Sequence, residues 1–347
     1  MRWSAVTVDN GTMTTVHDVG EFGLIDRLAR IVADARLDAP TAPGFRMRLG
    51  IGDDAAAWHA DDGVMVTTTD TMVEGVHFAQ GTTPWRDVGW KVMAANLSDI
   101  AAMGALPLHA LVTLGLPGET LLSVVEEMYY GMLEACDRYR LLLVGGDTVS
   151  AFNLFISVTV TGRCTSGPLT RSAARPGDAI GVTGSMGGSA GGLRLLQSPD
   201  SDTLQGSAAQ VLAQAHRRPA PRLEAGQHLV RAGIRCAMDI SDGLRADVAK
   251  LALASGVGAR VQAAQVPVEP CLTELLPKEA LQLALNGGEE YELLFTGRPE
   301  VVQRIVRELP GAALIGEVTA DTPGSVVVID EDGTELSVMR LGWDHLR

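Results

Sequence analysis

Seven aspartates stand in short frames of glycine and other small residues, and most of them follow an apolar run. The frames GIGDDAA, TTTDT, NLSDIAAMGA, GGDT and DISDG contain Asp53, Asp54, Asp70, Asp99, Asp147, Asp239 and Asp242. One such frame alone is typical of a turn, because Asp bonds its own backbone and Gly takes positive φ. Their joint occurrence predicts a fold that gathers hard cations, and Mg²⁺ shared between carboxylates and phosphate is the natural candidate.

The charge balance argues against a nucleic-acid partner. The net charge is −14, and the short run His216-Arg217-Arg218 is the one basic cluster in the sequence. Lysine occurs only at positions 91, 250 and 278. Anionic ligands must therefore be held by arginine, by backbone N–H groups or by metal.

Length and cysteine spacing bound the class of protein. At 347 residues the chain exceeds the usual size of one core, so we expect two domains. No two of the four cysteines form a CxxC pair, which predicts reduced thiols in a cytoplasmic protein. Neither a membrane-spanning segment nor an export signal is expected, because no apolar stretch approaches 18 residues and the first residues lack a basic and then apolar pattern.

Helical and extended patterns alternate in the first half, which is typical of mixed α/β proteins. We expect strands at 64–69, 109–116, 141–144 and 155–163, and helices at 21–36, 85–103 and 120–139. These form a four-stranded α/β unit with its helices on one face. Asn96 and Asp99, three residues apart, share one face of the second helix.

A loop rich in Gly, Pro, Ser and Arg follows at 164–178 and marks the domain boundary. It divides the chain into a disordered extension at 1–19, an N-terminal domain at 20–165 and a C-terminal α/β domain at 166–347. In the second half, strands are expected at 179–183, 259–263, 291–295, 313–318 and 326–329. Helices are expected after the glycine-rich segment 184–192, at 222–232 and from Leu244.

Two further segments allow two readings each. The glycine-rich segment 184–192 suits either a phosphate at a helix N-terminus or a flexible connection, and it matches no standard nucleotide fingerprint. The segment NGGEEYE at 286–292 is either a plain turn or a polar ligand site. His77, alone in EGVHF, is either structural or functional.

Together these motifs resemble the thiamine-monophosphate kinase family, in the superfamily that includes aminoimidazole-ribonucleotide synthetase. The resemblance covers nearly the whole chain in order. It runs through GIGDDAA, TTTDTMVEGVHF, WKVMAANLSDIAAMGALP, GGDTVS, LTRSAARPGD, RRPAPR, MDISDGL and GGEEYELLFT to the final GWDH.

The resemblance implies a fold and an activity. The fold has an N-terminal α/β domain whose sheet joins that of a second subunit in a dimeric barrel, and a larger C-terminal α/β domain. The implied activity of this homodimer is direct, in-line transfer of the γ-phosphoryl group of ATP onto thiamine monophosphate at a site with several Mg²⁺ ions.

The resemblance also implies the roles of residues. It assigns Mg²⁺ to the seven aspartates, helped by Thr68 and Thr69. We expect Asp70 and Asp147 to be the most critical, because they end predicted strands, where a charged group has little packing role but can reach a ligand. Contacts to ATP are assigned to Gly146, Asp147, Arg171 and Ser241, and contacts to the thiamine substrate to His77, Glu289 or Glu290, and Trp343. Because Glu290 stands where the family commonly has Asp, the acid that faces the substrate stays open. Core packing is the other reading of Trp343.

Two other function classes stay open. One is a related ATP-dependent synthetase that acts on another substrate. The other is a non-catalytic nucleotide-binding homologue, against which the complete set of aspartates argues. A phosphohydrolase based on Asp70 is disfavoured, because TTTDT lacks the D-x-D spacing of such a site.

Overall fold

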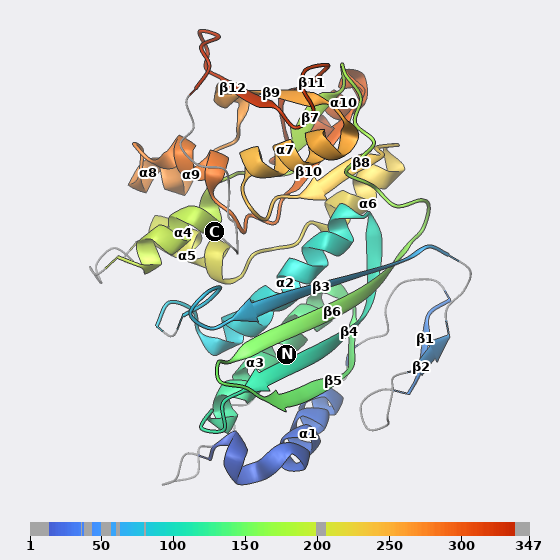
Figure 1. Cartoon of the computed structure of the whole chain (residues 1–347), viewed down its shortest axis with the longest axis vertical. Coiled ribbons are helices and arrows are strands. Elements are labelled where there is room, and N and C mark those ends of the chain that lie inside the picture. The colour runs from blue at the N-terminus through green and yellow to red at the C-terminus, as the bar shows by residue number, and fades with distance from the viewer. Residues whose placement is uncertain are drawn as a thin grey trace.

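The computed structural model describes residues 14–35, 37, 44–49, 57–59, 63–79, 81–198 and 206–336. Figure 1 shows two α/β units stacked along the long axis, each built on one mixed sheet. The expected mixed α/β class is thereby confirmed. Both large sheets are open in the single chain, so the barrel implied for a dimer is not formed within it.

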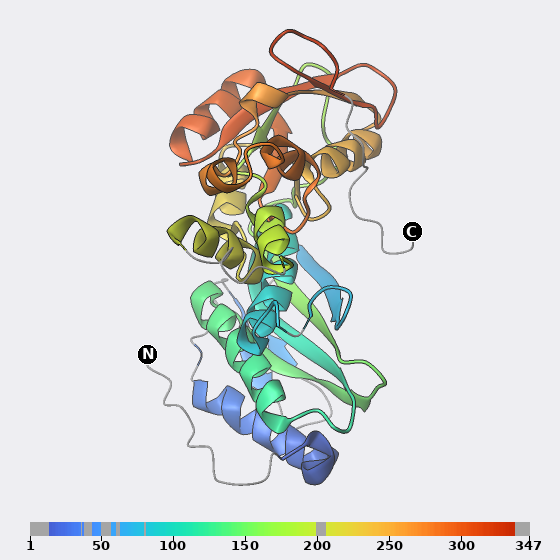
Figure 2. The same cartoon turned by 90° about the vertical axis from the view of Figure 1, so that its left-hand side faces the viewer.

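The first unit contains the four strands that the sequence predicted, in the order β3-β6-β4-β5. Their bounds are β3 (Met65–Val73), β4 (Ala105–Leu116), β5 (Leu142–Ser150) and β6 (Phe155–Cys164). Only β4 and β5 are parallel, and the helix α3 (Leu122–Tyr139) makes the crossover that parallel strands require. Figure 2 shows α1 (Val16–Ala35), α2 (Trp85–Ala102) and α3 on one face of this sheet, as expected.

The other face of the first sheet carries rows of hydroxyl groups. Thr67, Thr69 and Thr71 alternate with the helix-facing positions of β3, and their hydroxyls pair with those of β6 at 3.4, 3.2 and 2.8 Å. Leu111 and Val149, on β4 and β5, are 39% and 41% exposed. This face therefore combines rows of hydroxyl groups with partly exposed apolar side chains.

The helix α2 is shared by the two units. It buries 14 of its 18 residues, which means that apolar contacts surround it instead of lining one stripe. On one side it packs on β3, β4 and β6, and on the other on α6 (Leu223–Arg231) and β8 (Cys236–Asp239). The buried polar groups Lys91 and Ser98 of α2 consequently meet residues of the second unit, Glu289 and Asp239.

The second unit is built on six strands in the order β12-β9-β11-β7-β10-β8. They are β7 (Ala179–Val182), β8, β9 (Gly258–Gln262), β10 (Leu293–Gly297), β11 (Ala313–Thr319) and β12 (Val326–Ile329). Around them lie α4 (Gly188–Leu196), α5 (Ser207–Arg217), α6, α7 (Leu244–Ser255), η2 (Ala263–Gln265), α8 (Pro270–Leu275), α9 (Ala280–Asn286) and α10 (Pro299–Glu308). The sequence patterns did not predict β8, α5, α8, α9 or α10.

The chain before the first sheet differs from expectation. Helix α1 begins at Val16, and the N–H of Val16 donates to the carbonyl of Thr120. The expected disordered extension is therefore wrong for residues 14–19, and residues 1–13 lie outside the described part. The small sheet of β1 (Arg46–Leu49) and β2 (Ala57–His59) brackets the GIGDDAA sequence.

None of the helices in the described ranges has both the length and the apolar character that crossing a bilayer requires.

Two glycines let α2 and α3 pack closely. A Cβ at Gly131 would lie 1.8 Å from the carbonyl oxygen of Arg86, and one at Gly89 would lie 1.9 Å from that of Met128. We predict that Gly131→Ala destabilises the protein by about 1–3 kcal/mol, because neither backbone can yield without moving a helix. Thermal unfolding should show a lower midpoint, while Gly167→Ala, at an open position, serves as the control. An unchanged midpoint for Gly131→Ala would contradict this packing.

Candidate active site

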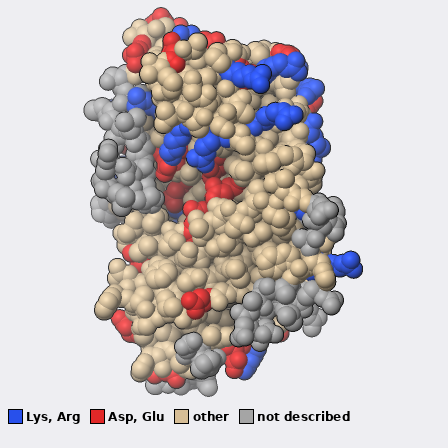
Figure 3. All heavy atoms as spheres, turned by 45° about the vertical axis from the view of Figure 1, so that its right-hand side comes forward, with Lys and Arg blue, Asp and Glu red and all other residues tan. Residues whose placement is uncertain are grey.

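Acidic side chains gather in a hollow between the two units, with basic side chains along the rim of the second unit (Figure 3). Three of the predicted aspartates form what we call the acidic cluster: Asp70 from β3, Asp99 from α2 and Asp239 from β8. Burial, joined by the negative charges of Asp99, Asp247 and Asp70, raises the pKa of Asp239 to about 8, against a hydrogen bond from Ser98. The fold thus brings together carboxylates that repel one another.

Hydrogen bonds between α2 and β3 fix the positions of two members of the acidic cluster, Asp70 and Asp99. The Thr68 hydroxyl donates to Asp99, and the N–H of Asp70 donates to the Asn96 side chain at 3.2 Å. Since β3 is an edge strand, its outward N–H would otherwise have no strand partner. The predicted common face of Asn96 and Asp99 is confirmed. Burial raises the pKa of Asp99, whereas the Thr68 hydrogen bond and the charge of Arg171 lower it.

Thr68 and Thr69 lie on opposite faces of β3. Thr68 faces α2, whereas the Thr69 hydroxyl donates to the carbonyl of Val158 on the open face of the sheet. Of the two threonines assigned to metal by the resemblance, Thr68 is therefore the one beside the acidic cluster.

The DISDG turn carries Asp239, Ser241 and Asp242 and is built around a buried acid that our sequence analysis missed. Asp247 Oδ2 accepts the N–H groups of residues 241, 242 and 243 at 3.0, 3.0 and 3.2 Å. An acid in the first turn of α7 also complements the helix dipole, and that position was the available signal. Lys250 donates to both Asp247 and Asp242.

The segment 287–292 turns back into the junction with two residues in the left-handed region, Glu289 at φ 62° and Tyr291 at φ 54°. Left-handed backbone at such residues is strained and persists only where its surroundings hold it. Glu289 accepts a 2.8 Å bond from Lys91, which is 1% exposed in the middle of α2. Burial alone would raise the pKa of Glu289, but the charge and hydrogen bond of Lys91, together with the nearby imidazoles of His216 and His77, hold this pKa below its usual value.

Lys91 and Glu289 belong to a buried network with His216 and Ser189. Lys91 Nζ lies 3.2 Å from His216 Nε2, and His216 Nδ1 lies 3.2 Å from the Ser189 hydroxyl. Burial lowers the pKa of His216 to about 4, so this imidazole is neutral near pH 7. The motif that contains Lys91 was recognised in the sequence, but the sequence does not indicate whether a lysine on a helix is buried or exposed.

Glu290 points away from Glu289 and into the start of α4. Its Oε2 accepts the N–H of Ser189 at 3.4 Å, and its Oε1 is buried without a hydrogen-bond partner among the described residues. Burial raises the pKa of Glu290 to about 8, against the backbone hydrogen bonds that lower it. The helix α4 begins inside the glycine-rich segment 184–192, at Gly188, and its first N–H groups face a carboxyl group of the chain itself.

The third acid of this segment, Glu292, is paired. It accepts from Arg222 Nε at 2.8 Å and from the Thr183 hydroxyl at 2.6 Å.

His77 lies on the Glu289 side of the junction, close enough for its imidazole to lower the pKa of Glu289 whenever the ring is protonated. Its Nδ1 accepts the backbone N–H of Val73 at 3.1 Å, which leaves the proton of the neutral ring on Nε2. An imidazole oriented in this way is a donor.

Asp147 and Gly146 are not brought to the acidic cluster within one chain. They lie on β5, three strands from β3, which corresponds to roughly 14 Å at the usual strand spacing. Asp147 also shares a register row with Thr113, Ser157 and Thr71, and so belongs to the open face. Asp53, Asp54 and Trp343 lie outside the described residues.

The donor set suits Mg²⁺ in its chemistry. Asp70, Asp99 and Asp239 offer only oxygen atoms, and their mutual repulsion is what a bound cation relieves. Within the described ranges, no three His, Cys, Asp or Glu side chains are grouped closely enough to hold a metal ion alone. Water or substrate oxygen would have to complete the coordination.

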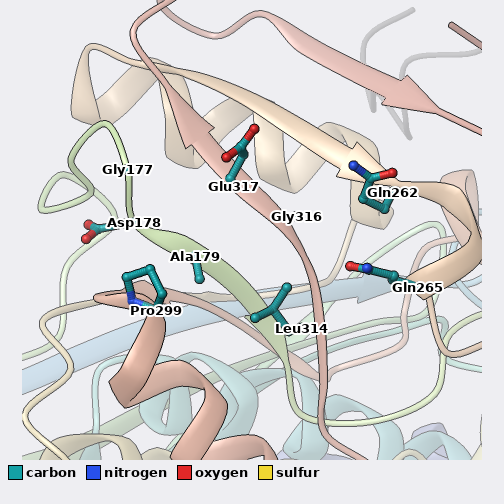
Figure 4. A pocket seen from close by; sticks show the side chains of 9 residues that line it. All are labelled: Gly177, Asp178, Ala179, Gln262, Gln265, Pro299, Leu314, Gly316 and Glu317. Carbon is teal, nitrogen blue, oxygen red and sulfur yellow. The ribbon is translucent and has the colours of Figure 1, made fainter. Parts of the chain in front are cut away.

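A separate cavity of about 320 Å³ lies against the second sheet and is lined by residues that include Asp178, Gln262, Gln265 and Glu317 (Figure 4). The Asp178 carboxylate accepts the N–H of Arg175, and Glu317 accepts from Arg260. None of the predicted site residues lines it. Both acids have partners of their own, so we assign no chemistry to this cavity.

Comparison with known proteins supports the same grouping of motifs. The family model for the AIR synthase related protein N-terminal domain matches residues 52–164, and that for the C-terminal domain matches residues 175–329. The chain is 37% identical to a thiamine-monophosphate kinase of Bacillus subtilis over 86% of this chain and 94% of that protein.

Solved structures agree with this. A thiamine-monophosphate kinase from Stenotrophomonas maltophilia superposes with a TM-score of 0.75 at 35% identity, over 90% of this chain and 96% of that one. A structure described as AaThiL complexed with AMPPCP and TMP superposes with a TM-score of 0.73 at 31% identity, over 96% of this chain and 100% of that one.

Proposed function

The chain belongs to the thiamine-monophosphate kinase family, and from this premise we propose that it transfers the γ-phosphoryl group of ATP onto thiamine monophosphate to give thiamine diphosphate. The observation that carries the proposal is the acidic cluster of Asp70, Asp99 and Asp239 at the junction of the two units. The complex of AaThiL with AMPPCP and TMP supports the pairing of an ATP analogue with such an acceptor in this fold.

The proposed reaction does not require the protein to remove a proton from the acceptor. A phosphate monoester has a second pKa of about 6, so the acceptor is mostly a dianion at neutral pH and needs no general base. The site must instead bring two polyanions together in line and balance their charge. Mg²⁺ bound there would supply that charge balance.

In this proposal the chain's own residues divide the work. Asp70, Asp99, Asp239 and Asp242 hold Mg²⁺, joined by Asp53, Asp54 and Asp147, with Thr68 beside Asp99. Arg171, whose charge acts on Asp99, and Ser241 contact ATP, as does Gly146.

Asp147 takes part through a second copy of the chain. It lies on the opposite face of the first sheet from Asp70, so a partner's sheet must bring another Asp147 to each cluster. The partly exposed Leu111 and Val149 beside it supply apolar contact area on the same side. We therefore propose a homodimer with shared sites.

The acceptor side is assigned to His77 and Glu289. Glu289 keeps 27% of its side chain exposed and lies near His77, whereas Glu290 is occupied at the start of α4. Trp343 stays part of the proposal on the resemblance alone.

The four cysteines are free, and three of them are buried. Unpaired thiols suit a reducing compartment, so we propose that the enzyme works in the cytoplasm.

The first test is an assay of ADP release with ATP and thiamine monophosphate, with and without Mg²⁺. We predict activity only with both Mg²⁺ and thiamine monophosphate, and a loss of at least about a hundredfold in Asp70→Asn, because a cation ligand acts on transition-state charge. Asp34→Asn, at an exposed position on α1, is the control. Full activity of folded Asp70→Asn, or equal turnover with another acceptor, would contradict the assignment.

The second test concerns the shared site. Asp147→Asn and Asp239→Asn should each be inactive, but the two chains expressed together should regain about a quarter of wild-type activity, since half of the random dimers are mixed and each mixed dimer holds one intact site. Activity is measured on the whole co-expressed mixture, and the purified mixed dimer alone should reach about half of wild-type activity, because one of its two sites is intact. A monomeric mass by light scattering, or an inactive mixed dimer, would rule out sharing.

A third prediction addresses the acceptor. His77→Ala should raise the KM for thiamine monophosphate roughly tenfold and leave the KM for ATP nearly unchanged, since one lost contact corresponds to about 1–3 kcal/mol. Steady-state kinetics with each substrate varied provides the measurement. Val76→Ala, at the exposed neighbouring residue, is the control. A lower melting temperature with both KM values unchanged would indicate a structural role instead.

A further inference from the structure

Lys250, on α7, bridges two acids, of which Asp247 is buried and Asp242 is partly exposed. Its Nζ donates to Asp247 Oδ1 at 2.7 Å and also to Asp242 Oδ2. The chain has two other lysines. Lys91 belongs to the buried network with Glu289, and Lys278 lies on the exposed surface. Lys250 is thus the lysine bound directly to the DISDG turn.

Asp247 is the fixed end of this bridge. Its side chain is 0% exposed, and its Oδ2 already holds three backbone N–H groups of the DISDG turn. Removing a partner from such a buried carboxylate is costly, so Asp247 keeps its place.

Asp242 is the free end of the bridge. Its side chain is 29% exposed, and its Oδ2 contacts a lysine that is itself 41% exposed. A lysine ammonium on a flexible four-carbon stem can leave such a contact for water with little rearrangement.

We propose that Lys250 is a resident counter-cation for Asp242: without bound metal its ammonium neutralises the Asp242 carboxylate, and a divalent cation that binds Asp242 displaces it. During the exchange Lys250 stays bonded to Asp247, so the DISDG turn does not move. The inference rests on the proposed function, because that function assigns Asp242 to the cation.

The electrostatic reason is direct. A divalent cation on the Asp242 carboxylate and an ammonium on the same carboxylate would lie within a few ångström of each other, and like charges at that distance repel strongly in a partly buried site. Lys250 therefore lowers the affinity of the free protein for cations, and it keeps the turn neutralised until a cation arrives.

The exchange is tested by calorimetric titration of the full chain with Mg²⁺ alone. Lys250→Gln keeps a donor for Asp247 but loses the charge, and Lys250→Met loses both. We expect both variants to bind Mg²⁺ about tenfold more tightly than the wild type, and Lys278→Met to match the wild type. Thermal unfolding of each variant reports whether the Asp247 contact matters for the fold.

A second readout follows the ammonium itself. With ¹⁵N-labelled lysine, the Nζ signal of Lys250, identified by its loss in Lys250→Gln, should shift along the calorimetric binding curve while that of Lys278 stays constant. Mg²⁺ binding in Lys250→Gln no tighter than in the wild type, or a Lys250 signal that ignores bound Mg²⁺, overturns the proposal. The proposal is also overturned if the double variant Lys250→Gln, Asp242→Asn still binds Mg²⁺ more tightly than the wild type. The ADP-release assay of Asp70→Asn judges the proposed function separately.

Discussion

The burial of α2 between two sheets is the constraint on which the rest of the structure depends. A helix that is apolar on all sides must be covered on all sides, and here one unit alone does not cover it. The two units are therefore held together by the hydrophobic burial of one element. Lys91, Asn96, Ser98 and Asp99 share that element, so packing energy and site geometry are coupled. Each of these polar groups meets a partner from another element, which is what burial of a polar group requires.

Two helix starts that are suited to anions are already filled by the chain's own acids. Asp247 takes the N–H groups at the start of α7, and Glu290 takes that of Ser189 at the start of α4. A helix N-terminus is a ready site for phosphate only while its N–H groups are free. The protein has few lysines as well, and one of the three is buried. Phosphate binding in the proposed function therefore depends on metal and arginine more than on helix dipoles, which agrees with the concentration of carboxylates at the junction.

The two faces of the first sheet have different tasks. The helix-facing side is apolar and carries Thr68 and Asp70 to the junction, while the open side carries hydroxyl rows and Asp147. Because side chains alternate along a strand, residues close in sequence or register can be far apart in function. A residue on the open face reaches the site only through another molecule. This asymmetry is the structural reason for the proposed dimer.

Local pattern was enough to predict the four strands of the first unit, the helices that cover them and the common face of Asn96 and Asp99, because period and spacing act over a few residues. It was not enough for β8, α5 or α10, which are short or whose pattern was not recognised, nor for the order of strands. The sequence by itself also determined which acids, threonines and glycines are available for chemistry. Only the tertiary structure decided that Glu289 faces Lys91 while Glu290 caps α4, that Asp247 organises the DISDG turn, and that Asp147 lies apart from Asp70. These outcomes depend on contacts between residues far apart in the chain, and such contacts are selected by packing and desolvation, which no local pattern records.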